Sequence, residues 1–264
     1  MSWYTGDPTY DSLLAIALAF AGLVAVAAWF FPSSYGRFST PKFGLRLDPR
    51  LGWLLMELPA PIVFTVAFLA GPRHTEPVPL LFLAVFLIHY ANRGYYFPLS
   101  MRVPKGSRGT FSAMIVAFGW LSTSLHGYLN GTFAGGLGSH LTDAWLTDPR
   151  FLAGITIYYA SYVLNIRSDA IVRNLRTREE VATGMKVYRV PEGGLFRWVT
   201  NASYLTELTA WAGFALATWS LAGVYILALS AANLLPRAVA THRWYLERFP
   251  DYPRNRKILI PYLF

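Results

Sequence analysis

The first long apolar stretch of the sequence, residues 13–31, reads LLAIALAFAGLVAVAAWFF and holds 19 residues without a charged side chain. As an α-helix it is long enough to cross about 30 Å of hydrocarbon. Asp7 and Asp11 precede it and no Lys or Arg does, whereas a secretory signal peptide begins with a basic region. We therefore expect a first membrane span that stays in the mature protein.

The composition of the whole chain agrees with this stretch. Of 264 residues, 54% are hydrophobic and 14% are charged, where soluble domains carry about a quarter charged residues, and the mean hydropathy is +0.35. The 9 Trp, 16 Tyr and 18 Phe suit a long boundary between apolar and polar surroundings. The absence of cysteine excludes disulfide scaffolds, cysteine nucleophiles and thiolate metal sites. We expect one membrane-embedded domain over residues 1–264 and no metal.

Six further segments of the chain are apolar enough to be spans. The stretch 204–235 holds 32 residues with only Glu207 charged, about 48 Å of helix, which is too long for one crossing. Gly213, Gly223 and Ser220 favour two helices joined by a very short turn. The sequence then predicts an all-α bundle of seven transmembrane helices over residues 13–31, 51–70, 78–90, 110–129, 151–165, 204–219 and 221–235.

The distribution of basic residues tests this count. With seven spans, 21 of the 23 Lys and Arg residues fall on one side of the membrane, and only Arg73 and Arg150 fall on the other. With six spans, the tail 236–264 would lie opposite the other basic segments. Because basic loops stay in the cytoplasm, seven spans are favoured, with the N-terminus outside and the C-terminus in the cytoplasm. The net charge of +9 is explained by this topology and by contact with anionic lipid.

Two polar side chains lie at membrane depth, where ionisable groups are costly. Glu57 is about 10 Å from the cytoplasmic end of its span, and Tyr90, after His89, ends the next span at a comparable depth. A phenol beside a carboxyl group is a workable proton donor towards a carbonyl oxygen. The alternatives are a carboxyl group kept only for packing and an interfacial tyrosine of the aromatic belt. His126 is interpreted as a structural histidine.

A polar stripe follows the fifth predicted span. Asn165, Asp169, Arg173 and Arg176 fall at i, i+4, i+8 and i+11, which places them on one face if the helix continues. An amide and a carboxylate followed by two guanidinium groups suit a ligand that carries hydroxyl or amide groups and phosphates. The alternative is an Asp169–Arg173 pair that only stabilises the helix.

The tail repeats this kind of pattern. Arg237, Thr241 and Tyr245 recur every four residues, and the apolar segment 258–264 after a basic turn is expected to pack back onto the bundle. The segment 191–196, PEGGLF, is expected to be a turn before the sixth span.

These motifs, in this order, resemble the steroid 5α-reductases (3-oxo-5α-steroid 4-dehydrogenases). The resemblance covers roughly residues 50–264. It rests on Glu57-Leu-Pro59, His89-Tyr90, Asn165-Ile-Arg-Ser-Asp169, Pro191-Glu-Gly-Gly-Leu-Phe196, Ala217-Thr-Trp-Ser-Leu221 and the tail 242–261, HRWYLERFPDYPRNRKILIP.

The resemblance implies a seven-helix membrane enzyme that reduces the Δ4 double bond of a 3-oxosteroid with NADPH. Glu57 and Tyr90 would bind and polarise the 3-carbonyl group. The residues that would surround the dinucleotide are Arg108, Asn165, Asp169, Arg173, Arg176, Glu207, Arg237 and Tyr245. The chain departs from the family at Met56, where glutamine is frequent, at Ser203, where asparagine is common, and at Thr241, where histidine occurs.

Three other functions fit part of the sequence. They are another membrane sterol or enone reductase, a membrane S-adenosylmethionine-dependent methyltransferase, and a transporter or lipid-binding bundle. A methyltransferase has no need of the Glu57–Tyr90 pair, and a transporter is expected to show repeated halves, of which there is no sign.

The expected partners are a steroid or other lipophilic enone and the lipid bilayer. We expect no nucleic acid, because no such motif occurs, and no obligate protein partner. Arg outnumbers Lys 19 to 4, which favours a bacterial inner membrane over the endoplasmic reticulum membrane of a eukaryote.

Overall fold

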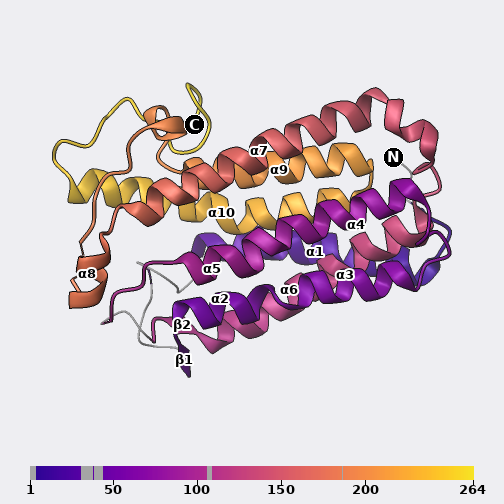
Figure 1. Ribbon diagram of the computed structural model, residues 1–264, viewed down its shortest axis with the longest axis horizontal. Helices are drawn as coiled ribbons and strands as arrows, with labels where there is room; N and C mark the ends of the chain where they lie inside the picture. Colours follow the sequence, from indigo (N-terminus) through magenta and orange to yellow (C-terminus); the bar gives the residue numbers. More distant parts are fainter. Residues whose placement is uncertain (1–3, 31–37, 39–43, 106–108, 186) are drawn as a thin grey trace.

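The computed structural model describes residues 4–30, 38, 44–105, 109–185 and 187–264. Long helices run side by side, and the N-terminus and the C-terminal tail lie at opposite ends of the molecule (Figure 1). The helices are α1 (Pro8–Phe30), α2 (Pro49–Glu57), α3 (Pro59–Leu69), α4 (Pro77–Tyr90), α5 (Phe97–Ser100), α6 (Ala113–Thr132), α7 (Pro149–Asn174), α8 (Arg178–Thr183), α9 (Ala202–Thr218) and α10 (Leu221–Arg248). The strands β1 (Arg46–Leu47) and β2 (Phe111–Ser112) form one short antiparallel pair.

In the part of the chain that the structure describes, helix covers most of each of the seven predicted spans, and the one departure from an all-α fold is the short β1–β2 pair, whose strand β2 falls at the start of the predicted span 110–129. Among the described residues, three helical runs are long and apolar enough to cross a membrane: Pro8–Phe30, Pro49–Leu69 and Leu221–Arg248. The protein is therefore an integral membrane protein. The second run is interrupted between α2 and α3 because Pro59 begins a new helix after Leu58.

Two helices extend well beyond their predicted spans. α7 continues past residue 165 to Asn174, and α10 continues past residue 235 to Arg248 with Pro236 inside it. α4 has only 14 residues, about 21 Å of helix. It is prolonged by a π-helical segment, Ala91–Tyr96, which leads into α5. This segment places Arg93 about one helical turn after Tyr90, so that both side chains contribute to the cavity described below.

Small residues let the helix backbones approach closely. Gly127, Gly131 and Gly135, four residues apart, face α3, and a Cβ atom added to Gly131 would come within 2.4 Å of the Phe64 carbonyl oxygen. Such spacing is a common way for membrane helices to pack, because van der Waals contact replaces the hydrophobic effect in lipid. Phe64 stacks on Phe86 of α4 with the ring centroids 3.9 Å apart, in the middle of the main apolar core.

α7 and α9 also pack closely through small residues. A Cβ atom added to Gly154 would lie 2.4 Å from the Ala217 nitrogen. After α9 the chain turns sharply at Trp219, whose φ is 47°, and Ser220 caps α10 by accepting a hydrogen bond from the Gly223 nitrogen at 2.9 Å. The predicted short turn between two helices is confirmed.

The C-terminal tail returns to the start of α9. The Thr200 nitrogen donates to the Lys257 carbonyl at 2.8 Å, and the Asn201 side chain donates to the Ile258 carbonyl at 2.8 Å. Leu259 is 2% exposed. The predicted packing of the tail onto the bundle is confirmed, and α8 lies at the same end of the molecule (Figure 1).

Candidate active site

One cavity of about 590 Å³ opens inside the bundle among α1, α2, α4, α6, α9 and α10. Its wall is mostly apolar, and its volume is that of a small-molecule site, for which about 300–1,000 Å³ is usual. The polar side chains on the wall are Glu57, His89, Tyr90, Arg93, Ser112, Ser122, Thr123, His126, Glu207, Ser230 and Asn233. The cavity therefore suits an apolar ligand that carries few polar groups.

Glu57 and Tyr90, expected from the sequence at comparable depth, both line this cavity. Glu57 ends α2 and is 9% exposed, and Tyr90 ends α4 and is 4% exposed. The Tyr90 hydroxyl forms its hydrogen bond with His126 Nε2 at 2.5 Å, and not with Glu57. His126 on α6 is thus part of the cavity wall.

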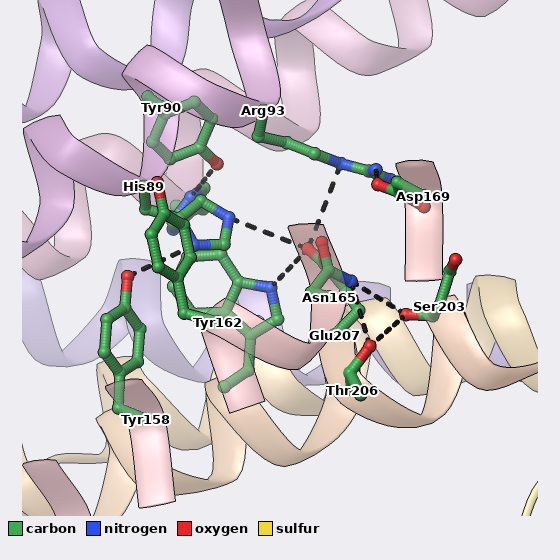
Figure 2. Close-up of polar contacts among 12 residues, drawn as sticks. His89, Tyr90, Arg93, Tyr158, Tyr162, Asn165, Asp169, Ser203, Thr206 and Glu207 are labelled. Carbon is green, nitrogen blue, oxygen red and sulfur yellow. Dashed lines mark hydrogen bonds and ion pairs between the residues drawn. The ribbon is translucent and has the colours of Figure 1, made fainter. Parts of the chain in front are cut away.

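A buried charge network lies beside Tyr90 (Figure 2). Arg93 Nε is 4.0 Å from Glu207 Oε1, and Arg93 Nη1 is 3.9 Å from Asp169 Oδ2. Glu207 Oε1 also accepts a hydrogen bond from the Trp211 indole at 3.1 Å and lies 3.7 Å from His89 Nε2. Because buried carboxylates are costly without a counter-charge, Arg93 holds Glu207 and Asp169 together.

Sequence reasoning counted Arg93 only as a topology charge. Its guanidinium group packs over the rings of Trp53 at 4.7 Å and Phe97 at 5.0 Å, which keeps it inside the molecule. The signal that could have identified it is its place three residues after Tyr90, on the same face if the helix continues.

Next to this network, α7 and α9 each present a buried polar atom that makes no hydrogen bond among the described residues. The Asn165 amide donates to the Ser203 carbonyl at 2.9 Å and contacts the Thr206 hydroxyl at 3.2 Å (Figure 2). Among the described residues, Asp169 Oδ2 and the Ser203 hydroxyl are buried with no hydrogen-bond partner. Buried polar groups are nearly always paired. A carboxylate oxygen and a hydroxyl group side by side fit a ligand with amide or hydroxyl groups.

The remaining predicted cofactor residues that the structure describes lie outside the cavity. Arg173 donates to the Ser100 hydroxyl at 2.9 Å, and Arg176 packs over Tyr188 at 5.4 Å, both near the end of α7. Arg237 donates to the Tyr204 hydroxyl at 2.9 Å. Tyr245 is buried against the ring of Tyr252, 5.4 Å between centroids. Arg108 lies outside the described residues.

The predicted set thus falls into two groups. Glu57, Tyr90 and Glu207 share the cavity, and Asp169 joins them through Arg93. The other described members follow α7 and α10 towards the end of the molecule that carries α8 and the tail (Figure 1). A second hollow of about 750 Å³ lies there, lined by residues that include Asn174, Tyr188 and Phe249.

The chain is similar to proteins of one family along almost its whole length. Residues 110–264 match the family described as 3-oxo-5-alpha-steroid 4-dehydrogenase. The chain is 41% identical to 3-oxo-5-alpha-steroid 4-dehydrogenase 1 of Mus musculus over 249 residues, which are 93% of this chain and 91% of the mouse protein. It is 32% identical to steroid 5-alpha-reductase DET2 of Solanum lycopersicum over 257 residues, 97% of each chain. With the protein of Homo sapiens named 3-oxo-5-alpha-steroid 4-dehydrogenase 1 the identity is 38%, over 88% of this chain and 86% of the human one.

Proposed function

The chain belongs to the 3-oxo-5-alpha-steroid 4-dehydrogenase family, and we propose that it uses NADPH to reduce the Δ4 double bond of a 3-oxosteroid to the 5α-reduced product. The observation that carries the proposal is the mostly apolar cavity whose wall holds both a phenol, Tyr90, and a carboxyl group, Glu57. A steroid is an apolar body with few polar groups, and the mostly apolar wall of the cavity suits such a ligand.

Tyr90 is the residue proposed to act on the substrate carbonyl. Reduction of the enone places negative charge on the carbonyl oxygen, and a hydroxyl group already aimed at that oxygen stabilises the charge without reorganising solvent. Glu57, on the same cavity wall, would orient the carbonyl group and the phenol. When bound, NADPH would supply the hydride for the β-carbon of the enone, and the α-carbon takes a proton. The apolar wall keeps bulk water away from the reacting atoms.

The residues present fit the cofactor. Asn165, Asp169 and Ser203 would hold its amide and ribose hydroxyl groups, because Asp169 Oδ2 and the Ser203 hydroxyl are buried and make no hydrogen bond among the described residues. Glu207, held by Arg93, closes the same side of the cavity. Guanidinium groups bind phosphates through paired N–H donors. The cationic residues proposed for the phosphates are Arg108, Arg173, Arg176 and Arg237, and Tyr245 would contact the dinucleotide from α10.

The proposed topology has seven spans within a single domain, residues 1–264, with the N-terminus outside and the C-terminal tail in the cytoplasm. It is supported by helix in every predicted span and by the one-sided distribution of Lys and Arg. NADPH would then enter from the cytoplasm, and an apolar steroid or other enone from the lipid. The membrane we favour is a bacterial inner membrane.

The experiment is anaerobic NADPH oxidation by the detergent-purified protein with a 3-oxo-Δ4-steroid, followed by mass spectrometry of the product. The expected product is heavier by two hydrogens. Tyr90→Phe is expected to lower kcat by about 10²–10³-fold, the usual cost of one donor to an oxyanion, and Glu57→Gln by about 10²-fold. The controls are Tyr95→Phe and Glu179→Gln, because both side chains are exposed and lie outside the cavity.

Each alternative function predicts a different result. A reduced product at wild-type rates in both variants would keep the reductase and remove Glu57 and Tyr90 from the carbonyl site. NADPH binding without steroid reduction would direct the search to other membrane sterol or enone substrates. A chain that binds S-adenosylmethionine and not NADPH would overturn the proposal in favour of a methyltransferase.

A further inference from the structure

His126 has no role in the reaction proposed for this cavity, yet it is the one hydrogen-bond partner of the Tyr90 hydroxyl among the described residues. The two atoms are 2.5 Å apart, and both side chains are about 4% exposed. His126 lies on α6 and packs against the rings of Phe86 on α4 and Trp211 on α9. The direction of this hydrogen bond decides where the Tyr90 proton points.

Asn130, one turn further along α6, fixes the direction. Its Nδ2 donates to the His126 carbonyl at 3.0 Å and to the Ala222 carbonyl at 3.2 Å. A flipped amide would place Oδ1 against two carbonyl oxygens, which are also acceptors, so the orientation of the Asn130 amide is set by its surroundings.

The same Asn130 Nδ2 lies 3.4 Å from His126 Nδ1. An N–H group at Nδ1 would face the N–H groups of the amide, donor against donor. The geometry points to Nδ1 as the bare nitrogen, with the proton of the neutral imidazole on Nε2. Nε2–H then donates to the Tyr90 oxygen, and the phenol keeps its own proton for another acceptor.

We propose, in an inference that rests on the proposed reduction, that His126 is a positioning residue: it directs the hydroxyl proton of Tyr90 towards the cavity. A histidine with the opposite tautomer would accept that proton and leave the substrate carbonyl without a donor. Because a hydroxyl group that accepts one hydrogen bond becomes a better donor of the next, the bond from His126 also strengthens the bond from Tyr90 to the carbonyl oxygen. Asn130 serves by fixing the tautomer.

The tautomer is read directly from the nitrogen NMR spectrum of protein labelled with ¹⁵N-histidine in detergent. His126→Gln identifies the two ring nitrogens of His126 by their loss from the spectrum. We expect the proton on Nε2 and none on Nδ1. A proton on Nδ1 with a bare Nε2 would overturn the proposal whatever the activity.

The kinetic test compares two variants of His126. His126→Leu removes the donor. It is expected to lower kcat about tenfold, which is the effect of losing one hydrogen bond that acts in the transition state, and to leave KM within about threefold of the wild-type value. His126→Gln retains an N–H donor of similar reach and is expected to keep kcat within about threefold. The Tyr90→Phe variant has no phenol to position, so adding His126→Leu to it should not lower kcat any further.

The results distinguish a positioning role for His126 from a purely structural one. An equal loss from His126→Leu in both backgrounds would show a structural role and overturn the proposal, as would a loss confined to KM. A wild-type chain that carries the Nε2 proton but reduces no enone would overturn the proposed function, and the assignment of the tautomer would stand. An active wild type with the Nδ1 proton would overturn the role of His126 alone.

Discussion

At the scale of single residues, the site depends on one positive charge placed between two negative ones. Arg93 is 4.0 Å from Glu207 and 3.9 Å from Asp169, and all three side chains are largely buried. Removing one partner of a buried ion pair typically costs about 3–5 kcal/mol, because the other charge is left without compensation. We expect Arg93→Met to lower the stability of the purified protein by about that amount.

The measurement is thermal unfolding in detergent, with Arg243→Met as control, since Arg243 is exposed. The double variant Arg93→Met with Glu207→Gln removes one of the uncompensated charges and should recover part of the loss. An Arg93→Met protein as stable as the control would contradict the buried network.

Single residues also show which parts of the site could be predicted from one sequence. Glu57 and Tyr90 could be chosen because ionisable or hydroxyl groups are rare at membrane depth, and Glu207 came from the family resemblance; the three do share one cavity. The contacts of Arg93 and His126 were not predicted, for a physical reason. Arg93 lies in the π-helical segment after α4, and His126 joins α6 to α4 through its hydrogen bond with Tyr90; neither placement follows from residue spacing in one chain.

At the scale of elements, the α3–α6 contact depends on the glycine row. A Cβ atom at Gly131 would lie 2.4 Å from a backbone carbonyl oxygen, which cannot move without shifting α3. We expect Gly131→Ala to destabilise the protein by about 1–3 kcal/mol, the usual cost of overpacking. Gly22 of α1 is a matched control, because an added Cβ there meets nothing within 4 Å.

Gly22→Ala should leave thermal stability unchanged or raise it slightly, since alanine is the better helix former. Equal effects of the two variants would contradict close packing at Gly131. The four-residue spacing of Gly127, Gly131 and Gly135 is visible in the sequence, whereas the facing helix is not, because spacing alone names no partner.

A second element, α8, is held by an exposed ion pair that should respond to pH. Glu180 accepts hydrogen bonds from Arg189 at 2.5 Å and from the Thr177 nitrogen at 2.9 Å. These hydrogen bonds lower the pKa of Glu180 from 4.5 to about 2. The bond from Arg189 has the largest effect, and the bond from the Thr177 nitrogen, which caps the helix, adds to it. A carboxyl group with a lowered pKa stabilises the fold above its unfolded pKa, and this contribution is lost as pH falls from about 4.5 towards 2.

Hydrogen exchange followed by mass spectrometry, corrected for the intrinsic pH dependence, measures this loss in peptides from residues 177–190. Exchange should quicken as pH is lowered through that range in the wild type. In Glu180→Gln, which has no charge to lose, it should start faster and change little. A pH response preserved in Glu180→Gln would assign the effect to another group.

At the scale of the whole molecule, the proposed topology would make the site accessible to a charged cofactor from the cytoplasm and to an apolar substrate from the lipid. The sequence predicted the helices themselves well, because an apolar run of sufficient length is a strong signal. It predicted their ends poorly. α7 and α10 continue far past their apolar parts, because the polar extensions are stabilised by packing, as when Arg173 binds Ser100 and Arg237 binds Tyr204.

The topology can be tested cleanly because the chain contains no cysteine. Single cysteines at the exposed positions Ser139, Ala182 and Asn255 place a thiol between α6 and α7, in α8 and in the tail. In intact cells, a membrane-impermeant maleimide is expected to label Ser139→Cys at once and the other two only after permeabilisation. Seven spans place Ala182 and Asn255 on the same side of the membrane, whereas six spans place them on opposite sides. Labelling of Asn255→Cys but not Ala182→Cys in intact cells would therefore contradict the seventh span and, with it, the entry of NADPH beside the tail.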